Sequence, residues 1–195
     1  MAWCFTAMTA PDVPAVALAP AARYSPLARA LHWIVALLVA IQLGLGWIAE
    51  HGTSADGGMR MLRWHYQLGM VLLLAMLPRI ATRLARGAPE AAPGQPRWQG
   101  RIARATHLGL YLLLCLLPAS GYVVWVWMEA PMDVLGIVEV PRAFRPPADD
   151  ERGRAIAWYL HVYGAWSLAV LIVLHVAAAL WHALVRRDGL MRRMW

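Results

Sequence analysis

Four long apolar segments dominate this sequence, and they limit what the chain can fold into. The segments are Leu31–Ala49, Trp64–Leu77 with an extension past Arg79 to about Leu84, Thr106–Met128 and Ala155–Val185. A helix that crosses the hydrocarbon core of a membrane needs about 20 mostly apolar residues. Backbone groups in lipid must satisfy their own hydrogen bonds, which an open sheet cannot do. The sequence therefore predicts an all-α protein, a bundle of four transmembrane helices.

The composition supports a membrane protein and argues against two other classes. Apolar residues make up 61% of the chain and charged residues 15%, which excludes a disordered protein and argues against an ordinary soluble enzyme. The formal net charge is +7, and every basic residue is Arg. A basic chain can bind nucleic acid or a membrane surface. The hydrophobicity favours the membrane, so we expect lipid and no nucleic acid among its partners.

Capping residues and prolines predict where the first helix begins and where the membrane domain starts. Residues 1–22 lack the basic start and long apolar core of a signal peptide, and Pro11, Pro14 and Pro20 predict a loose N-terminal leader. Ser25 followed by Pro26 is typical of a helix N-terminus, so the first helix should begin before its apolar run. Residues 23–195 are then one membrane domain. Cys4 and Cys115 form no CxxC pair, which excludes an iron–sulfur or Cys-rich zinc site.

The distribution of Arg predicts how the bundle faces the membrane. Six Arg and one acidic residue lie between Arg79 and Arg104, and four Arg and one acidic residue follow Val185. The connections at 50–63 and 129–154 carry at least as many acidic residues as Arg. Cytoplasmic loops of membrane proteins are enriched in Arg and Lys. We therefore expect the N- and C-termini to be cytoplasmic.

Histidine is the residue type that most clearly suggests a function. Six of the seven histidines lie in or at the ends of the apolar segments: His32, His65, His107, His161, His175 and His182. Ionisable residues in membrane spans are rare and usually face the interior of the bundle. His161 and His175 share one helix face to within about 40° and lie about 21 Å apart along the axis. Two imidazoles of one helix therefore enter the bundle at two depths.

The helix directions predict which histidines meet. His32 should lie near the cytoplasmic side with His175, and His65 near the outer side with His161. Imidazole suits haem iron and a bundle core suits a porphyrin, so these pairs predict two bis-His haem sites. In upright helices, His32 and His175 would differ in depth by up to about 12 Å, which helix tilt would have to remove. A lone histidine on an apolar face is more often structural, but four at two matched depths are harder to explain that way.

Other residues have two readings each. His107 either competes with His32 for the inner site or makes an interfacial hydrogen bond. His182 binds a haem propionate or a quinone oxygen, or lies among headgroups. Arg79 pairs with a propionate, or it serves as an anchor that reaches toward the headgroups. Glycines in the spans allow close approach of a helix or of a flat ring, and helix packing is the simpler explanation for most.

Several stretches resemble the bacterial cytochrome b561 family. They are RYSPLARALHW (Arg23–Trp33), HYQLG (His65–Gly69), HLGLYLLLCLLPASGY (His107–Tyr122), LHVYGAWSLAVLIVLHVAAALWH (Leu160–His182) and RRDGLMRRM (Arg186–Met194). The resemblance covers residues 23–195. It implies a multi-pass protein of the bacterial inner membrane with two b-type haems, whose ligand positions match His32, His65, His161 and His175. It also implies electron transfer to or from quinone, with ubiquinone as the redox partner.

The expected function is transmembrane electron transfer between a quinone pool and a donor or acceptor at the outer face. Some members of the family oxidise superoxide there, and a cationic outer mouth would attract that anion. The candidate cations are Arg60, Arg63, Arg152 and Arg154, with nearby acids that weaken their field. One alternative is a b-type anchor subunit of a dehydrogenase or hydrogenase. Another is a metal or ion transporter, which the lack of Asp and Glu in the spans disfavours.

Overall fold

The computed structural model describes residues 23–52, 54–87, 96–147 and 149–195. Four helices make up most of this part of the chain: α1 (Pro26–His51), α2 (Ala55–Arg86), α3 (Arg97–Trp127) and α4 (Glu151–Trp181). By length and composition, each can cross a membrane. The predicted all-α class with four transmembrane helices is confirmed. The expected leader, residues 1–22, lies outside the described residues.

The helices begin where capping residues stand, which is not always where the apolar runs begin. The Ser25 side chain accepts a hydrogen bond from the Ala28 amide, and Pro26 is the first helical residue, as predicted. α2 is longer than its apolar run and begins at Ala55, because Ser54 caps the Gly57 amide. Hydropathy identifies the membrane span, whereas capping sets the helix end, so the two boundaries differ.

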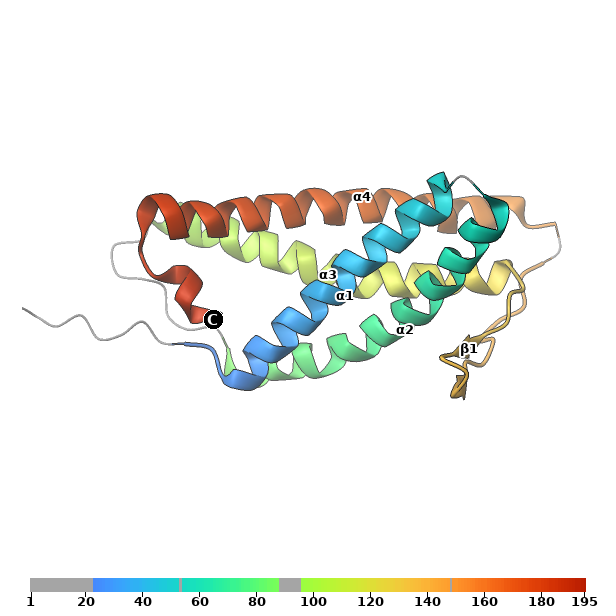
Figure 1. Cartoon of the computed structure of the whole chain (residues 1–195), viewed down its shortest axis with the longest axis horizontal. Coiled ribbons are helices and arrows are strands. Elements are labelled where there is room, and N and C mark those ends of the chain that lie inside the picture. The colour runs from blue at the N-terminus through green and yellow to red at the C-terminus, as the bar shows by residue number, and fades with distance from the viewer. Residues whose placement is uncertain (1–22, 53, 88–95, 148) are drawn as a thin grey trace, which may run out of the picture.

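The bundle consists of two helical hairpins. α1 packs most closely against α2, and α3 against α4, while the contact between the hairpins is less extensive. Figure 1 shows α1 crossing the bundle obliquely, with α3 and α4 running along its length. We call the end with the α1–α2 and α3–α4 connections the loop side, and the end with the start of α1 and the end of α4 the tail side.

A small apolar core lies in the middle of the bundle. It contains buried residues from all four helices: Val35, Val39, Leu72, Met76, Leu114, Leu117 and Leu168. Most other large apolar side chains on the helices are exposed. Exposed apolar surface of this extent is expected when lipid, and not water, surrounds the helices.

The connection between α3 and α4 folds over the loop side. It contains a two-stranded hairpin, β1 (Asp133–Val134) and β2 (Val138–Glu139), which the sequence did not reveal because each strand has only two residues. Positive φ angles at Leu135 and Gly136 form its turn. Met132 packs with Trp125 in a second buried cluster.

The tail side is closed by the C-terminal segment. After α4 come a π-helical turn, η1 (His182–Arg186), and a 3₁₀ turn, η2 (Leu190–Arg193). The segment then packs along the start of α1. The Tyr24 amide donates to the Arg193 carbonyl at 3.1 Å, and the Trp33 indole donates to the Met194 carbonyl at 3.1 Å. The first and last described elements of the domain are thus joined.

Candidate functional site

His65 of α2 and His161 of α4 meet on the loop side. Their ring centroids are 5.9 Å apart, and the rings are nearly perpendicular. His65 Nδ1 lies 3.1 Å from the Gln42 carbonyl of α1, and Gln42 Nε2 donates to the His65 carbonyl at 3.0 Å. A carbonyl only accepts, so Nδ1 carries the proton and Nε2 keeps its lone pair.

His161 is held in the same tautomer by α3. Its Nδ1 lies 3.1 Å from the Leu117 carbonyl and 3.0 Å from Ser120 Oγ. The Ser120 hydroxyl donates to that same carbonyl at 3.0 Å, so its oxygen accepts from His161. Both loop-side imidazoles therefore have a fixed orientation and an unprotonated Nε2.

Two glycines bring helix backbones close to these rings. A Cβ atom added at Gly121 would lie 2.9 Å from His161 Cε1, and one added at Gly46 would lie 3.3 Å from His65 Cε1. Gly109 and Gly164 instead face leucine side chains, in line with plain helix packing. Sequence reasoning singled out neither Gly46 nor Gly121 as a neighbour of a histidine, because glycine spacing alone does not say what lies opposite.

His32 of α1 and His175 of α4 meet on the tail side. Their ring centroids are 6.4 Å apart. The oblique course of α1 in Figure 1 accounts for this approach, since tilt removes the depth difference expected of upright helices. Both predicted pairings of histidines therefore exist as close contacts between the two hairpins.

A third imidazole belongs to the tail-side group. The ring of His107 on α3 is 5.3 Å from that of His175, closer than His32 is. His107 also hydrogen-bonds the backbone of Ala103, one turn earlier on its own helix. Distance alone therefore leaves both readings of His107 open, as a competitor for His32 and as a hydrogen-bonding residue.

Arg79 points into the bundle and not toward the headgroups, which favours the first of its two readings over the anchor. Its Nη2 is 3.1 Å from His32 Nδ1, and its guanidinium lies over the Tyr111 ring at 5.6 Å. The His32 imidazole on α1 and the Tyr111 ring on α3 hold the Arg79 side chain inside the bundle. Because arginine only donates, His32 Nδ1 accepts and the ring proton lies on Nε2. Coordination through Nε2 therefore requires that proton to move and Arg79 to find another acceptor.

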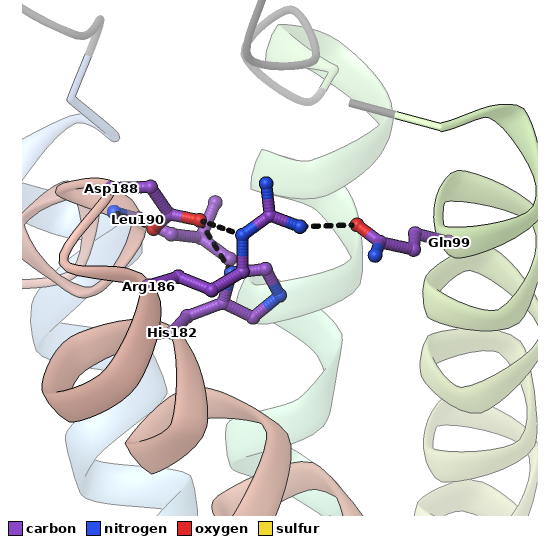
Figure 2. Close-up of polar contacts among 5 residues, drawn as sticks. All are labelled: Gln99, His182, Arg186, Asp188 and Leu190. Atoms are coloured by element: carbon purple, nitrogen blue, oxygen red, sulfur yellow. Dashed lines mark hydrogen bonds and ion pairs between the residues drawn. The ribbon is translucent and has the colours of Figure 1, made fainter. Parts of the chain in front are cut away.

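His182 is bound to a carboxylate at the end of the chain, as Figure 2 shows. Its Nδ1 donates to Asp188 Oδ2 at 2.6 Å, while Arg186 lies between Asp188 and Gln99. The left-handed backbone of Arg187, with a φ of 50°, turns the chain so that Asp188 comes back beneath His182. The Nε2 atom of His182 is then the ring nitrogen that remains for a ligand.

The surroundings of Asp188 favour its charged form. Partial burial raises the pKa of this carboxyl, but hydrogen bonds from His182 and the Leu190 amide, with the charges of His182 and Arg186, outweigh it. The net result is a pKa below the ordinary value of 3.8. The carboxylate therefore remains an acceptor for His182 at neutral pH.

The donor set fits haem. No three His, Cys, Asp or Glu side chains of the described ranges are grouped so that they could hold a bare metal ion. A porphyrin supplies four ligands to its iron and leaves two axial positions, which a pair of facing imidazoles fills. Hydrogen bonding of Nδ1 to a carbonyl is also how metal-ligating histidines are usually oriented. The loop-side cavity is about 70 Å³, smaller than a porphyrin, so the two hairpins would have to part to admit the group, and the contact between them is the less extensive one.

Four membrane-crossing helices with paired imidazoles between them define a class of multi-pass membrane cytochromes of b type. Within that class, the chain belongs to the prokaryotic cytochrome b561 family, whose model matches residues 23–195. It is a haem-binding electron-transport protein of the bacterial membrane.

Relatives align along nearly their whole length. Cytochrome b561 homolog 2 of Escherichia coli is 31% identical over 173 residues, covering 88% of this chain and 90% of the relative. The probable superoxide oxidase CybB of Yersinia pestis is 29% identical, covering 88% and 95%. Cytochrome b562 of Cereibacter sphaeroides is 28% identical, covering 88% and 94%.

Proposed function

We propose that this protein carries electrons across the bacterial inner membrane through two b-type haems, each held by two histidines. His65 and His161 hold the loop-side haem, and His32 and His175 hold the tail-side haem. The observation that carries the proposal is the pairing itself, with imidazole centroids 5.9 Å and 6.4 Å apart. The two α4 histidines are about 21 Å apart along the helix, so the sites lie toward opposite membrane surfaces.

When bound, haem supplies reversible one-electron chemistry at its iron. The paired histidines would hold the group and would keep substrates away from its iron. The Gln42 and Leu117 carbonyls hold the two loop-side imidazoles and increase their basicity through Nδ1. The apolar core excludes water between the sites.

The tail side faces the cytoplasm in this proposal, because the Arg-rich connection and the Arg-rich tail both lie there. With haem bound, Arg79 would exchange His32 for a propionate, a carboxylate that a guanidinium binds through two hydrogen bonds. His182 accepts through Nε2 from a hydroxyl of the reduced quinone, with ubiquinone as the quinone, because Nδ1 carries the ring proton that it donates to Asp188. Support for this role comes from its Asp188 contact, which leaves only that nitrogen available.

Superoxide is the proposed donor at the outer face. Support comes from the name of the Yersinia relative and from four exposed arginines on the loop side: Arg60, Arg63, Arg152 and Arg154. Arg63 lies 3.7 Å from Asp133, which reduces its contribution. Stopped-flow measurement of superoxide decay with ubiquinone tests the donor. The rate should rise with protein and fall with salt, and a rate insensitive to both would exclude superoxide.

The central test is a reduced-minus-oxidised spectrum of the purified protein with haem counted per polypeptide. Two b-type haems are expected. One haem would mean that one pair is wrongly assigned, and protein free of haem from haem-supplied cells would overturn the proposal.

A further inference from the structure

Trp125 is a buried hydrogen-bond donor without an acceptor. It lies near the end of α3, is 2% exposed, and packs beneath Met132 of the α3–α4 connection. Its indole Nε1 is buried and has no hydrogen-bond partner among the described residues. An indole N–H can only donate, and buried donors are nearly always paired. An acceptor for the Trp125 N–H must therefore come from outside the described residues.

The position of Trp125 indicates where that acceptor comes from. Trp125 follows Gly121 by one helical turn, and Gly121 is the residue that contacts the His161 ring. Trp125 lines the same cavity as His65 and His161. Its ring stacks on Tyr66, the neighbour of His65, with centroids 5.2 Å apart. The Trp125–Tyr66 stack therefore lies one turn from the loop-side pair, toward the membrane surface.

The other side-chain donors that line this cavity already have acceptors. The Tyr122 hydroxyl donates to the Pro141 carbonyl at 2.7 Å, and the Tyr66 hydroxyl contacts Met128 Sδ. The Gln42 amide donates to the His65 carbonyl. Among the described residues that line the cavity, none is Arg. A carboxylate entering here would find the Trp125 N–H as its uncommitted donor.

We propose that the Trp125 indole N–H donates a hydrogen bond to a propionate carboxylate of the loop-side haem, with Tyr66 holding the indole in place. This inference rests on the proposed function. Trp125 is then a binding residue for the prosthetic group in addition to the two axial histidines. A hydrogen bond to the carboxylate reduces its negative field at the iron, so it raises the reduction potential of that haem.

The test is Trp125→Phe, which keeps an aromatic ring for Tyr66 and removes the N–H together with part of the ring volume. The matched control is Trp127→Phe. Trp127 also has a buried Nε1 without a partner in the described part of the chain, at the same helix end, but it packs on Phe144 and does not line the cavity. The readouts are transfer of haem to apomyoglobin and the potential of each haem.

Trp125→Phe should retain both haems, lose one about tenfold faster than wild type, and lower the potential of that haem alone. Making Trp125→Phe in a His175→Ala background, which is expected to keep only the loop-side haem, shows whether the loop-side haem is the one affected. Trp127→Phe should match wild type. Equal effects of the two variants would overturn the proposal in favour of general packing. If haem loss and both potentials in Trp125→Phe equal those of wild type, the proposal is overturned in favour of a small anion or water as the acceptor. Haem-free wild type would instead overturn the proposed function.

Discussion

The two histidine pairs of this bundle differ in how much of their geometry is already set. On the loop side, each Nδ1 donates to a backbone carbonyl and a glycine fits against each ring. On the tail side, His32 Nδ1 accepts from Arg79, and a third imidazole, His107, lies 5.3 Å from His175. For the proposed coordination the loop-side pair is preorganised, whereas the tail-side pair would have to rearrange. One fold can therefore provide one rigid site and one adaptable site.

The largest expected effect comes from removing a member of the preorganised pair. His161→Ala should reduce haem content by about half, with the tail-side haem retained, because in the proposed assignment α4 supplies one axial ligand to each of two sites. Haem analysis and the difference spectrum of purified protein measure this. Retention of the full haem content would refute the assignment of His161 as a ligand.

The next comparison tests which imidazole faces His175. His32→Ala should lose the tail-side haem, whereas His107→Ala should keep it with an altered potential. Redox titration of both variants, with haem counted, decides between them. Loss of haem in His107→Ala alone would make His107 the ligand and return His32 to its contact with Arg79.

A smaller effect is expected from filling the space beside the His161 ring. In Gly121→Ala, the new Cβ would lie 2.9 Å from His161 Cε1, so the imidazole must shift away from its carbonyl partner. The potential of the loop-side haem should change and its loss should quicken. Gly44→Ala is the matched control, because a Cβ there meets nothing within 4 Å. Identical behaviour of the two variants would mean that the loop-side pair is not preorganised by Gly121.

Arg79→Gln tests the adaptable site. Loss of a charge-assisted hydrogen bond to a propionate should speed loss of the tail-side haem about tenfold and lower its potential. Arg86→Gln, which changes an exposed arginine of the same helix, serves as the control. An effect of the same size in both variants would indicate a general effect of positive charge.

The smallest effect concerns the closing turn beyond α4. The pKa of Asp188 is lowered in the folded protein, so its contribution to stability is present above the ordinary pKa of 3.8 and is lost as the pH falls through the lowered value. Asp188→Asn should cost about 0.5 kcal/mol at pH 7 and nothing at pH values below that lowered pKa. Thermal unfolding in detergent across this range measures it, with Glu139→Gln as the control. A cost that does not change with pH would point to lost packing instead.

The helices and the partners of each histidine could be predicted from the sequence. Hydropathy sets the spans, and a fixed rise per residue sets the depth of each side chain, so the sequence predicts that His161 lies near His65 and His175 near His32. These arguments need only local geometry and the direction of each helix. The ligand roles themselves stay a prediction.

What the sequence did not reveal depends on tertiary packing. The inward orientation of Arg79 depends on what Tyr111 and His32 present across the helix interfaces. For His107 the sequence leaves two readings open, and its distance from His175 depends on the packing of α3 against α4. The return of Asp188 to His182 depends on a π-helical turn and a left-handed residue, for which the sequence carries no simple signal.

The position of α4 in both pairs has a consequence for how the protein is made. A growing chain that has inserted only α1, α2 and α3 contains one member of each proposed pair. Under the proposed assignment, neither haem can receive both axial ligands until the last helix has entered the membrane. Haem loading therefore follows synthesis of the whole bundle, and the apoprotein must persist in the membrane without its redox groups. The apolar core and the join between the C-terminal segment and α1 are the contacts that can hold it together during that interval.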